Sequence, residues 1–501
     1  MKLLHFSRFC RLLLVLLWLV VIVSCNKMQP QSIRFGLATA PVTLDPRYAT
    51  DAVSHRINRL LYRRLVDFDE NYHMQPQLAD WQQLSSLHYR FHLLNKGRTF
   101  HNGQRLEADD VMATYDYVLD PANASPHRAT LTNIDRIEAI DADTLDVYIH
   151  EPDTLFPGRM VIGIVPASLI RAHHSFNEDP VGSGPLRFQQ WKSDDHLVLE
   201  RRDDGRLFEF ITVKDATVRV LKLVRGELDL VQGDLPFELL DWLREQPGIT
   251  VESRQGNVFT YIGFNLRDPV LSRLPIRQAI AFAIDREAII RHVLGNAARK
   301  AGALLTPDHW AGHPRLTGYP YDPARAARLL AGEGYDHQHP LQLSYKTSNN
   351  ALRLRLATII QYQLQRVGID VDLGSYDWGT FYADIKAGRF QMYSLSWVGL
   401  NMPDIFRYVF HSESLPPAGA NRGYFADAAT DRLIEQAENL TDLDRQAAVY
   451  HALQERLLEQ LPYVPLWYED NLLARRNDIQ GYRLSVNGDY DGLIDVERRN
   501  P

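Results

Sequence analysis

Stretches in which apolar and polar residues alternate recur through the first half of the chain. Residues 33–37, 89–93 and 145–149 alternate in this way, and two more stretches, 186–188 and 197–199, flank a polar turn. The side chains of a β-strand point alternately to its two faces, so a period of two residues predicts half-buried strands. Because turn-forming residues separate these stretches, the region that holds them is predicted to be rich in β-hairpins.

A different pattern begins at about residue 206, where predicted strands and helices take turns to the end of the chain. Apolar residues three to four apart predict helices at 237–244, 276–294, 324–330 and 352–367, and an earlier one at 53–61. Short apolar runs predict strands at 208–213, 228–231, 258–266 and 369–373. Strands that alternate with helices of this length predict an α/β fold around mostly parallel sheets.

Nothing in the sequence divides the chain into independent domains joined by linkers. It has no internal repeat, no low-complexity tract and no long linker, so interleaved lobes are expected. Gly182 and Gly184 flank Ser183 ahead of Pro185, an arrangement that suits a tight backbone passage between lobes, with an ordinary turn as the alternative.

The first 25 residues have the features of a secretory signal peptide. Three cations (Lys2, Arg8 and Arg11) precede the apolar run 12–23, which is shorter than the roughly 20 residues of a membrane-spanning helix. The run ends in Ile22-Val23-Ser24-Cys25, which resembles the lipobox of bacterial lipoproteins, in which the cysteine becomes the lipidated first residue. We therefore expect a signal peptide at 1–24 and lipid on Cys25; an uncleaved anchor is the alternative.

Composition and charge narrow the class of protein. Removal of residues 1–24 leaves 477 residues. Because 45% of the whole chain is hydrophobic and 23% is charged, we expect a large hydrophobic core. The three cations leave with the leader, so the net charge of −7 becomes −10, which disfavours nucleic-acid binding. Cys10 and Cys25 are the two cysteines of the chain, so we expect no disulfide and no thiolate chemistry.

Ten short motifs resemble, in order, those of the periplasmic solute-binding proteins of peptide-type ABC importers (extracellular solute-binding protein family 5). They span about 450 residues and are Leu44-Asp45-Pro46 with Leu61-Tyr62; Phe100-His101-Asn102-Gly103 with Ala108-Asp109-Asp110-Val111; Val181-Gly182-Ser183-Gly184-Pro185 with Trp191; Gly226-Glu227-Leu228-Asp229; Phe264-Asn265; Pro275-Ile276-Arg277-Gln278-Ala279; Ala283-Ile284-Asp285-Arg286; Gly368-Ile369; Trp397; and Pro462-Tyr463-Val464-Pro465-Leu466.

The resemblance implies an α/β, periplasmic-binding-protein-like fold of class C type, with two α/β lobes, an interlobe cleft and a hairpin-rich third lobe. After the leader 1–24 and a tether at 25–31, the expected division is lobe I at 32–75, 180–262 and 478–501, lobe II at 76–179, and lobe III at 263–477. A ligand is expected between lobes I and III, with closure by a hinge motion.

In that family the segment beginning at Trp397 lines the cleft, and here it departs from the pattern. Peptide-binding members carry an aspartate at the position of Leu400, where it pairs with the ammonium group of the ligand. A buried ammonium without a counter-charge is costly, so a free peptide N-terminus is not expected to be held in the usual way. Asp404 is a substitute for that aspartate, or else the N-cap of the helix that follows.

Further site residues follow from the same resemblance. Trp378 and Trp397 are expected as aromatic walls, with ordinary core packing as the alternative, and the backbone of Val398 and Gly399 as a place where an extended peptide adds a strand. The remaining expected contacts are Thr50 and Ala52 on the lobe I wall, Tyr261 at the interlobe crossing, and Asn401 beside Leu400.

Other functions fit the sequence less well. His337 with His339, and His173 with His174, lack the spacing and companion carboxylates of a metal site, so no metal and no cofactor are expected. No zinc-protease helix, nucleophile elbow or P-loop is present, so the chain is not expected to be an enzyme.

The resemblance implies a lipid-anchored subunit of an ABC importer that captures peptides or peptide-like solutes and presents them to the permease and ATPase complex. A monomer in the periplasm is expected, on either the inner or the outer membrane, with no nucleic-acid partner. A non-peptide ligand on the same fold (a metal complex, haem or a sugar-peptide) and a sensor or chaperone role stay open as alternatives.

Overall fold

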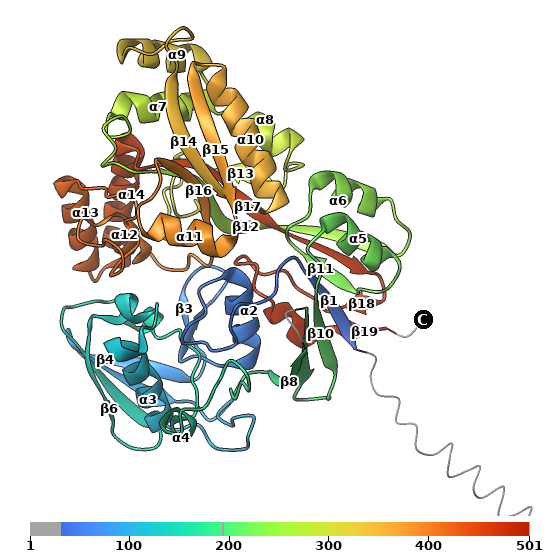
Figure 1. Cartoon of the computed structure of the whole chain (residues 1–501). Coiled ribbons are helices and arrows are strands. Elements are labelled where there is room, and N and C mark those ends of the chain that lie inside the picture. The colour runs from blue at the N-terminus through green and yellow to red at the C-terminus, as the bar shows by residue number, and fades with distance from the viewer. Residues whose placement is uncertain (1–31, 193–194, 500–501) are drawn as a thin grey trace, which may run out of the picture.

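The computed structural model describes residues 32–192 and 195–499, shown in colour in Figure 1. The predicted leader, the tether and the lipidation residue Cys25 lie outside the described residues. Within the described ranges, no helix is both long enough and apolar enough to cross a membrane.

One mixed sheet of eleven strands runs through the described part of the molecule in the order β15-β14-β16-β12-β17-β11-β1-β10-β9-β8, with β13 paired to β17. Its strands are β1 (Ile33–Leu37), β8 (Leu186–Lys192), β9 (His196–Arg201), β10 (Leu207–Thr212), β11 (Leu230–Gln232), β12 (Ile249–Phe264), β13 (Ala298–Lys300), β14 (Leu341–Ser348), β15 (Ile369–Tyr376), β16 (Met392–Trp397) and β17 (Tyr463–Arg476).

The prediction of mostly parallel sheets is only partly correct. Strand β1 runs parallel to β10 and β11, and β14 runs parallel to β15 and β16. The other pairs in the sheet are antiparallel, because the two longest strands, β12 and β17, run in opposite directions and also return against β16 and β11. Local alternation of strands and helices does not reveal such long-range returns.

Strands β12 and β17 join the two ends of this sheet. Their pairing extends from Ile249 opposite Arg476 to Gly263 opposite Tyr463, with an interruption between Arg254 and Val258. In Figure 1 they pass from the part that holds β1, β11 and α6 into the part that holds β14, β15 and β16. The two parts of the molecule are thus tied by strand pairing on both sides of this interruption.

A second, antiparallel sheet forms the region predicted to be rich in hairpins. Its order is β4 (Ala79–Ser85), β5 (His88–Leu93), β7 (Thr144–Ile149) and β6 (Ile134–Ala139). The strands predicted at 89–93 and 145–149 are confirmed as β5 and β7, and the predicted hairpin beyond residue 186 is confirmed as β8 and β9. Two small sheets complete the description: β2 (Val66–Phe68) with β3 (Met74–Pro76), and β18 (Ile479–Gln480) with β19 (Glu497–Arg498).

The helices begin where side chains satisfy free backbone N–H groups. Asp51, Asp215, Asp377 and Asp442 each accept such a bond at a helix start. The α-helices of the described residues are α2 (Ala52–Leu61), α3 (Ala108–Leu119), α4 (Ala167–Arg171), α5 (Ala216–Val224), α6 (Phe237–Arg244), α7 (Leu274–Ala283), α8 (Arg286–His292), α9 (Pro323–Gly332), α10 (Ala351–Gln365), α11 (Trp378–Lys386), α12 (Ile405–Phe410), α13 (Ala428–Glu438) and α14 (Leu443–Gln460).

The single helix predicted at 276–294 is wrong, because two helices occupy that range. Helix α7 ends at Ala283, and α8 begins at Arg286. Between them the Asp285 side chain accepts a hydrogen bond from the backbone N–H of Ala288 at 2.9 Å. The apolar period continues across this N-cap, so periodicity alone did not reveal the break.

The cores show how the parts of the chain are packed. One apolar cluster joins β1, α2 and the four-stranded sheet, so the ranges predicted as lobes I and II share a core. Two clusters cover the opposite faces of the second half of β12: Phe259 and Tyr261 belong to one, and Ile262 and Phe264 to the other. A fourth cluster lies between α5, α6 and the sheet.

Two of the sequence motifs meet in a tight backbone passage. The N–H of Gly184 donates to Leu61 O at 2.8 Å, at the end of α2, and the N–H of His101 donates to Gly182 O at 2.7 Å. A Cβ on either glycine would lie under 2.5 Å from a backbone oxygen of α2. The close approach predicted for this segment is confirmed.

Candidate functional site

The predicted site begins where β16 ends. Trp397 is its last residue and pairs with Phe259 of β12, and Val398 to Leu400 continue as irregular backbone. Val398 is 38% exposed. The N–H groups of Val398 and Gly399 make no backbone hydrogen bond to any described residue. A short, solvent-facing backbone edge with free donors therefore extends from the end of a buried sheet.

Leu400, at the position where a carboxylate would hold a ligand's ammonium, is a core residue. Its side chain is 5% exposed and packs in the apolar cluster with Phe406 and Phe410. Its carbonyl oxygen accepts a hydrogen bond from Asn257 Nδ2 at 3.2 Å. The position thus presents apolar surface to its surroundings and supplies no negative charge.

Asn401 is held through its backbone. His309 Nδ1 accepts a hydrogen bond from the N–H of Ala311 at 3.0 Å, so Nε2 carries the proton and donates to Asn401 O at 3.1 Å. Desolvation lowers the pKa of His309 to about 4, which keeps the ring neutral. The His309 ring also lies 4.7 Å from the ring of Tyr72, in the range predicted as lobe I. This histidine was not predicted from the sequence.

Asp404 occupies the expected N-cap position of α12, and its role as a substitute for the missing aspartate stays a prediction. It lies at the N-terminus of α12 but its side chain makes no capping hydrogen bond. Instead its carboxylate pairs with Arg159 at 3.0 Å, and Arg159 also pairs with Asp153 at 2.7 Å. Desolvation by burial raises the pKa of Asp404; Arg159 opposes this rise, and the charge of Asp153 adds to it.

The loop 400–404 is therefore fixed from three directions. Asn257 holds Leu400, His309 holds Asn401, and Arg159 holds Asp404. Two of these anchors, Asn257 and His309, come from the sheet and from an irregular segment after β13, and the third comes from the hairpin-rich region. Such multiple anchoring gives a site wall of defined geometry.

The aromatic walls predicted at Trp378 and Trp397 lie in one connected group. Trp378, the first residue of α11, is 46% exposed and stacks on Tyr382 with ring centroids 5.3 Å apart. Trp397 is half-buried and makes an edge contact with Tyr408. The guanidinium of Arg422 lies between the two groups, 5.3 Å from the Tyr382 ring and 5.0 Å from the Trp397 ring. Arg422 was not predicted from the sequence as a site residue.

Tyr261 is fully buried beneath this wall. Its ring stacks on Tyr463 at 4.0 Å and makes an edge contact with Tyr393 at 5.9 Å. Burial raises the pKa of all three tyrosines, which keeps their hydroxyl groups neutral. Direct contact of Tyr261 with a ligand stays a prediction.

The residues predicted for the lobe I wall lie at the start of α2. Thr50 is exposed, Ala52 is half-buried as the first helical residue, and Asp51 between them caps the helix. One turn further, His55 is exposed, yet desolvation and the nearby charge of Arg59 lower its pKa to about 3.

Charged groups of separate elements influence one another near the start of α2. Asp234, exposed between β11 and α6, acts on both Arg56 of α2 and Arg353 of α10, whose pKa values lie above the usual value despite desolvation. Arg353 also pairs with both carboxylate oxygens of Glu469. Desolvation works against the charged form of Glu469, but Arg353 outweighs it and lowers the pKa of Glu469. Each of these carboxylates thus has an arginine nearby.

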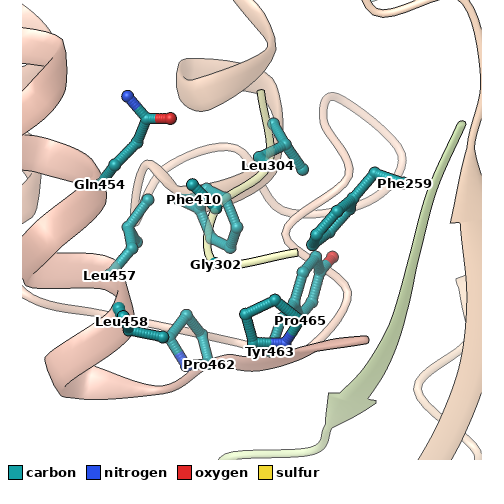
Figure 2. A pocket seen from close by; sticks show the side chains of 11 residues that line it. Phe259, Gly302, Leu304, Phe410, Gln454, Leu457, Leu458, Pro462, Tyr463 and Pro465 are labelled. Atoms are coloured by element: carbon teal, nitrogen blue, oxygen red, sulfur yellow. The ribbon is translucent and has the colours of Figure 1, made fainter. Parts of the chain in front are cut away.

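Figure 2 shows a separate, mostly apolar pocket. It is lined by Phe259, Phe410, Leu304 and the end of α14, with Gln454 as a polar member. The amide nitrogen of Gln454 already donates to Ala311 O and Tyr450 O. Gln454 Oε1 and the hydroxyl of Tyr463, another lining residue, have no hydrogen-bond partner among the described residues, and the other pocket walls are mostly apolar. Within the described residues, no three histidine, cysteine, aspartate or glutamate side chains are grouped as a metal site.

Comparisons with known proteins bear on the family and the fold of the chain. The family model "Bacterial extracellular solute-binding proteins, family 5 Middle" matches residues 73–414. The oligopeptide-binding protein AppA of Bacillus subtilis strain 168 is 25% identical over 498 residues, which cover 92% of this chain and 90% of the relative. Heme-binding protein A of Haemophilus influenzae is 27% identical over 502 residues, covering 92% of this chain and 91% of the relative.

A solved structure extends the likeness to the fold. The structure of AppA from Bacillus subtilis in complex with a nonapeptide superimposes with a TM-score of 0.85 at 23% identity, over 94% of this chain and 99% of that one. The predicted α/β, periplasmic-binding-protein-like fold is confirmed. The relatives are named as binding proteins, as predicted for a chain that is not an enzyme. By the match of the family model over more than half its length, this chain belongs to the bacterial extracellular solute-binding proteins of family 5.

Proposed function

We propose that this chain is the lipid-anchored solute-binding subunit of an ABC importer and captures a peptide or peptide-like solute between its lobes. As a member of its family it acts outside the cytoplasm. The proposed ligand site lies between the β16–α12 segment and the start of α2. In this proposal the bound solute is passed to a permease, and the protein performs no chemistry on it.

The observation that carries the proposal is the backbone edge at Val398 and Gly399. Its free N–H groups lie beside Trp397, in a loop fixed from three directions. An extended peptide can pair with such an edge through its own backbone, which gives affinity without demanding a particular side chain. AppA, a relative over most of the chain, is named an oligopeptide-binding protein.

The buried Leu400 restricts which peptides fit. It supplies no carboxylate, and the nearby Asp404 is paired with Arg159. A ligand ammonium placed here would be desolvated without a counter-charge. The proposal therefore favours solutes that lack a free N-terminus at this point, such as N-blocked peptides. A relative named for haem makes a non-peptide solute the second outcome that the test must distinguish.

The test is native mass spectrometry of the soluble protein that begins after Cys25, purified from periplasm without refolding. We expect an additional bound mass that fragments as a peptide or a blocked peptide. A single non-peptide mass would keep the fold and refute the peptide class. An empty protein that also ignores a peptide library in thermal unfolding would favour a sensor or chaperone role.

Trp397→Ala tests the position of the site. The indole supplies a large apolar contact, so its loss should weaken ligand binding by about tenfold or more while the far-UV circular dichroism is unchanged. Because Trp397 also packs against the core, the variant should lose about 2–3 kcal/mol of stability. Leu443→Ala, at an exposed apolar residue of α14, is the control. Unchanged affinity in Trp397→Ala would refute the location of the site.

The lipid anchor has its own test. The proposal expects the purified membrane form to carry acyl chains on Cys25 as its first residue, detected by mass spectrometry of the N-terminal peptide. Cys25→Ser should release the protein into the soluble fraction while ligand binding is retained. A Cys25→Ser protein that stays with the membrane would refute lipid anchoring and favour an uncleaved N-terminal segment.

A further inference from the structure

Arg422 is a buried cation without a counter-charge, in the loop between α12 and α13. Its residue is 6% exposed, and its guanidinium donates one hydrogen bond, from Nη2 to the hydroxyl of Tyr382 at 3.0 Å. No carboxylate of a described residue forms an ion pair with it. A guanidinium has five N–H donors, and the described residues accept from one of its nitrogens.

The other buried arginines of the described chain show that this is unusual for the molecule. Each of them pairs with a carboxylate or donates to at least two backbone carbonyls: Arg47, Arg64, Arg98, Arg201, Arg219, Arg277 and Arg286. Arg277, for example, donates to four carbonyl oxygens. Burial of a charge is costly unless it is paired and hydrogen-bonded, so Arg422 is the exception that needs a reason.

The backbone around Arg422 is held firmly. Asn421 Nδ2 donates to the carbonyl oxygens of His411 and Phe425, and its Oδ1 accepts from the N–H of Phe425. Gly423 O accepts from the N–H of Leu266 at 2.8 Å. The loop that carries Arg422 is therefore well anchored. The fold itself holds the guanidinium next to the aromatic wall.

Arg422 also lies close to the proposed ligand site. Its guanidinium is 5.0 Å from the ring of Trp397, the residue directly before the free backbone edge at Val398 and Gly399. On its other side, the stacked rings of Tyr382 and Trp378 lead from the guanidinium to a side chain that is 46% exposed. A ligand that packs against Trp397 would thus be separated from the guanidinium by one aromatic ring.

The carboxylates around the site already have arginine partners. Glu469 is paired with Arg353, and Asp404 shares Arg159 with Asp153. The position that could have supplied another carboxylate is Leu400, which is apolar and buried. Arg422 itself has no carboxylate partner among the described residues, so electrostatic complementarity calls for a negative group from the ligand.

We infer that Arg422 is an anion-recognition residue of the ligand site and that the solute carries a carboxylate which pairs with its guanidinium. This inference rests on the proposed ligand site and names the chemical class of its solute. A carboxylate matches the planar fork of an arginine through two parallel hydrogen bonds. The solute would be held by its acidic end, in a site that has no partner for an ammonium group.

Two synthetic tripeptides separate the two ends of a peptide. N-acetyl-trialanine has a free carboxylate and no ammonium, whereas trialanine amide has a free ammonium and no carboxylate. Isothermal titration of the ligand-free protein should show binding of the acetylated peptide only. Binding of the amide as tight as that of the acetylated peptide would overturn the inference, and this comparison needs no variant.

Variants then assign the effect to Arg422. Arg422→Gln should weaken binding of N-acetyl-trialanine by about ten- to a hundredfold, the usual effect of losing a charged hydrogen-bond pair. Arg422→Lys should recover part of the affinity, because it keeps the charge and loses the planar fork. Arg445→Gln, at an exposed arginine of α14, is the matched control and should bind as the wild type. Equal affinity in wild type and Arg422→Gln would overturn the inference.

A second readout keeps this inference apart from the proposed peptide function. The solute that copurifies with the wild type is extracted and methyl-esterified, and each carboxyl group then gains the mass of one methylene. An acidic solute that is not a peptide would refute the peptide proposal and support Arg422 as the anion site. A solute with no acidic group would overturn the Arg422 inference. A protein that binds neither tripeptide and carries no acidic solute would overturn both.

Discussion

Single glycines decide how closely α2 and the segment 181–185 approach each other. A Cβ added at Gly182 would lie 2.1 Å from Leu61 O. That atom belongs to the backbone, which cannot rotate away as a side chain can. We predict that Gly182→Ala lowers the free energy of unfolding by about 3 kcal/mol in urea titrations.

Gly332→Ala is the control for that substitution. Gly332 ends α9, and an added Cβ there meets no atom within 4 Å. We expect its stability to be unchanged or raised by about 0.5–1 kcal/mol, because alanine restricts the unfolded chain. Similar losses in the two variants would contradict the close approach at Gly182.

His101 adds a pH dependence to the same passage. The N–H of Gly182 donates to its Nδ1, so Nε2 carries the proton and donates to Gly184 O. Desolvation lowers the pKa of His101 to about 4, whereas a histidine of the unfolded chain titrates near about 6.5. The stabilising contribution is therefore complete above about pH 6.5 and is lost as the pH falls from there toward 4.

We predict that His101→Gln flattens this acid dependence by about 1–3 kcal/mol between pH 7 and 4.5. The measurement is urea unfolding at several pH values for the wild type and the variant. His309, whose pKa is also lowered to about 4, contributes in the same direction and stays in both proteins. Parallel pH curves for the two proteins would show that His101 is not responsible.

At the same scale, the sequence revealed only part of the site. Trp397, Leu400 and their segment were located by a motif that lies within a few residues. Arg159 could not be connected with Asp404, because 245 positions separate them and the contact exists only in the folded chain. Arg422 was missed for a related reason, since an arginine becomes notable only when its burial and its missing counter-charge are known.

At the scale of helices, Asp427 joins α13 to α14. Its carboxylate accepts from the N–H of Thr430 at the start of α13 and from two guanidinium nitrogens of Arg456 on α14. The hydrogen bonds of Arg456 lower the pKa of Asp427 well below its usual range. Its stabilising effect is thus present above the unfolded-state value of about 4 and is lost as the pH falls below it.

Asp427→Asn should lower stability by about 1–2 kcal/mol at pH 7 and by less at pH 3. Chemical unfolding at the two pH values measures both quantities. Asp442→Asn, which changes the cap of α14 without a recorded ion pair, is the matched comparison and should show a smaller pH dependence. An equal loss at both pH values for Asp427→Asn would contradict the role of its charge.

The sequence predicted best those helices and strands that are determined by their own residues and not by contacts with distant segments. Helix α6 was predicted at the residues it occupies, because its apolar period and its ends agree. Strand β12 was predicted from Val258 onward and begins nine positions earlier, at Ile249. The missed half contains Glu252, Ser253 and Arg254 and is held by pairing with β17, more than 200 residues away.

At the scale of the whole molecule, the order of the motifs along the chain indicated the fold, although no single motif was specific enough to do so. The segments that carry the resemblance form backbone contacts, as between Gly182 and His101, and such contacts demand particular residue types at fixed places. The fold was therefore predictable. The charge balance of the site was not, because it depends on which arginines and carboxylates the fold brings together.

The ion pair of Arg159 with Asp404 joins the hairpin-rich region to the end of the β16 segment, and it should favour the closed arrangement of the molecule. Its side chains are 15% and 26% exposed, so its loss should cost about 1–3 kcal/mol. A shift of about 2 kcal/mol changes the ratio of closed to open forms about thirtyfold. We predict that Asp404→Asn increases the radius of gyration of the ligand-free protein in small-angle X-ray scattering and weakens ligand binding. Arg136→Gln, on the surface of the hairpin-rich region, should change neither. If Asp404→Asn loses affinity without any change in radius, the carboxylate contacts the ligand and does not control closure.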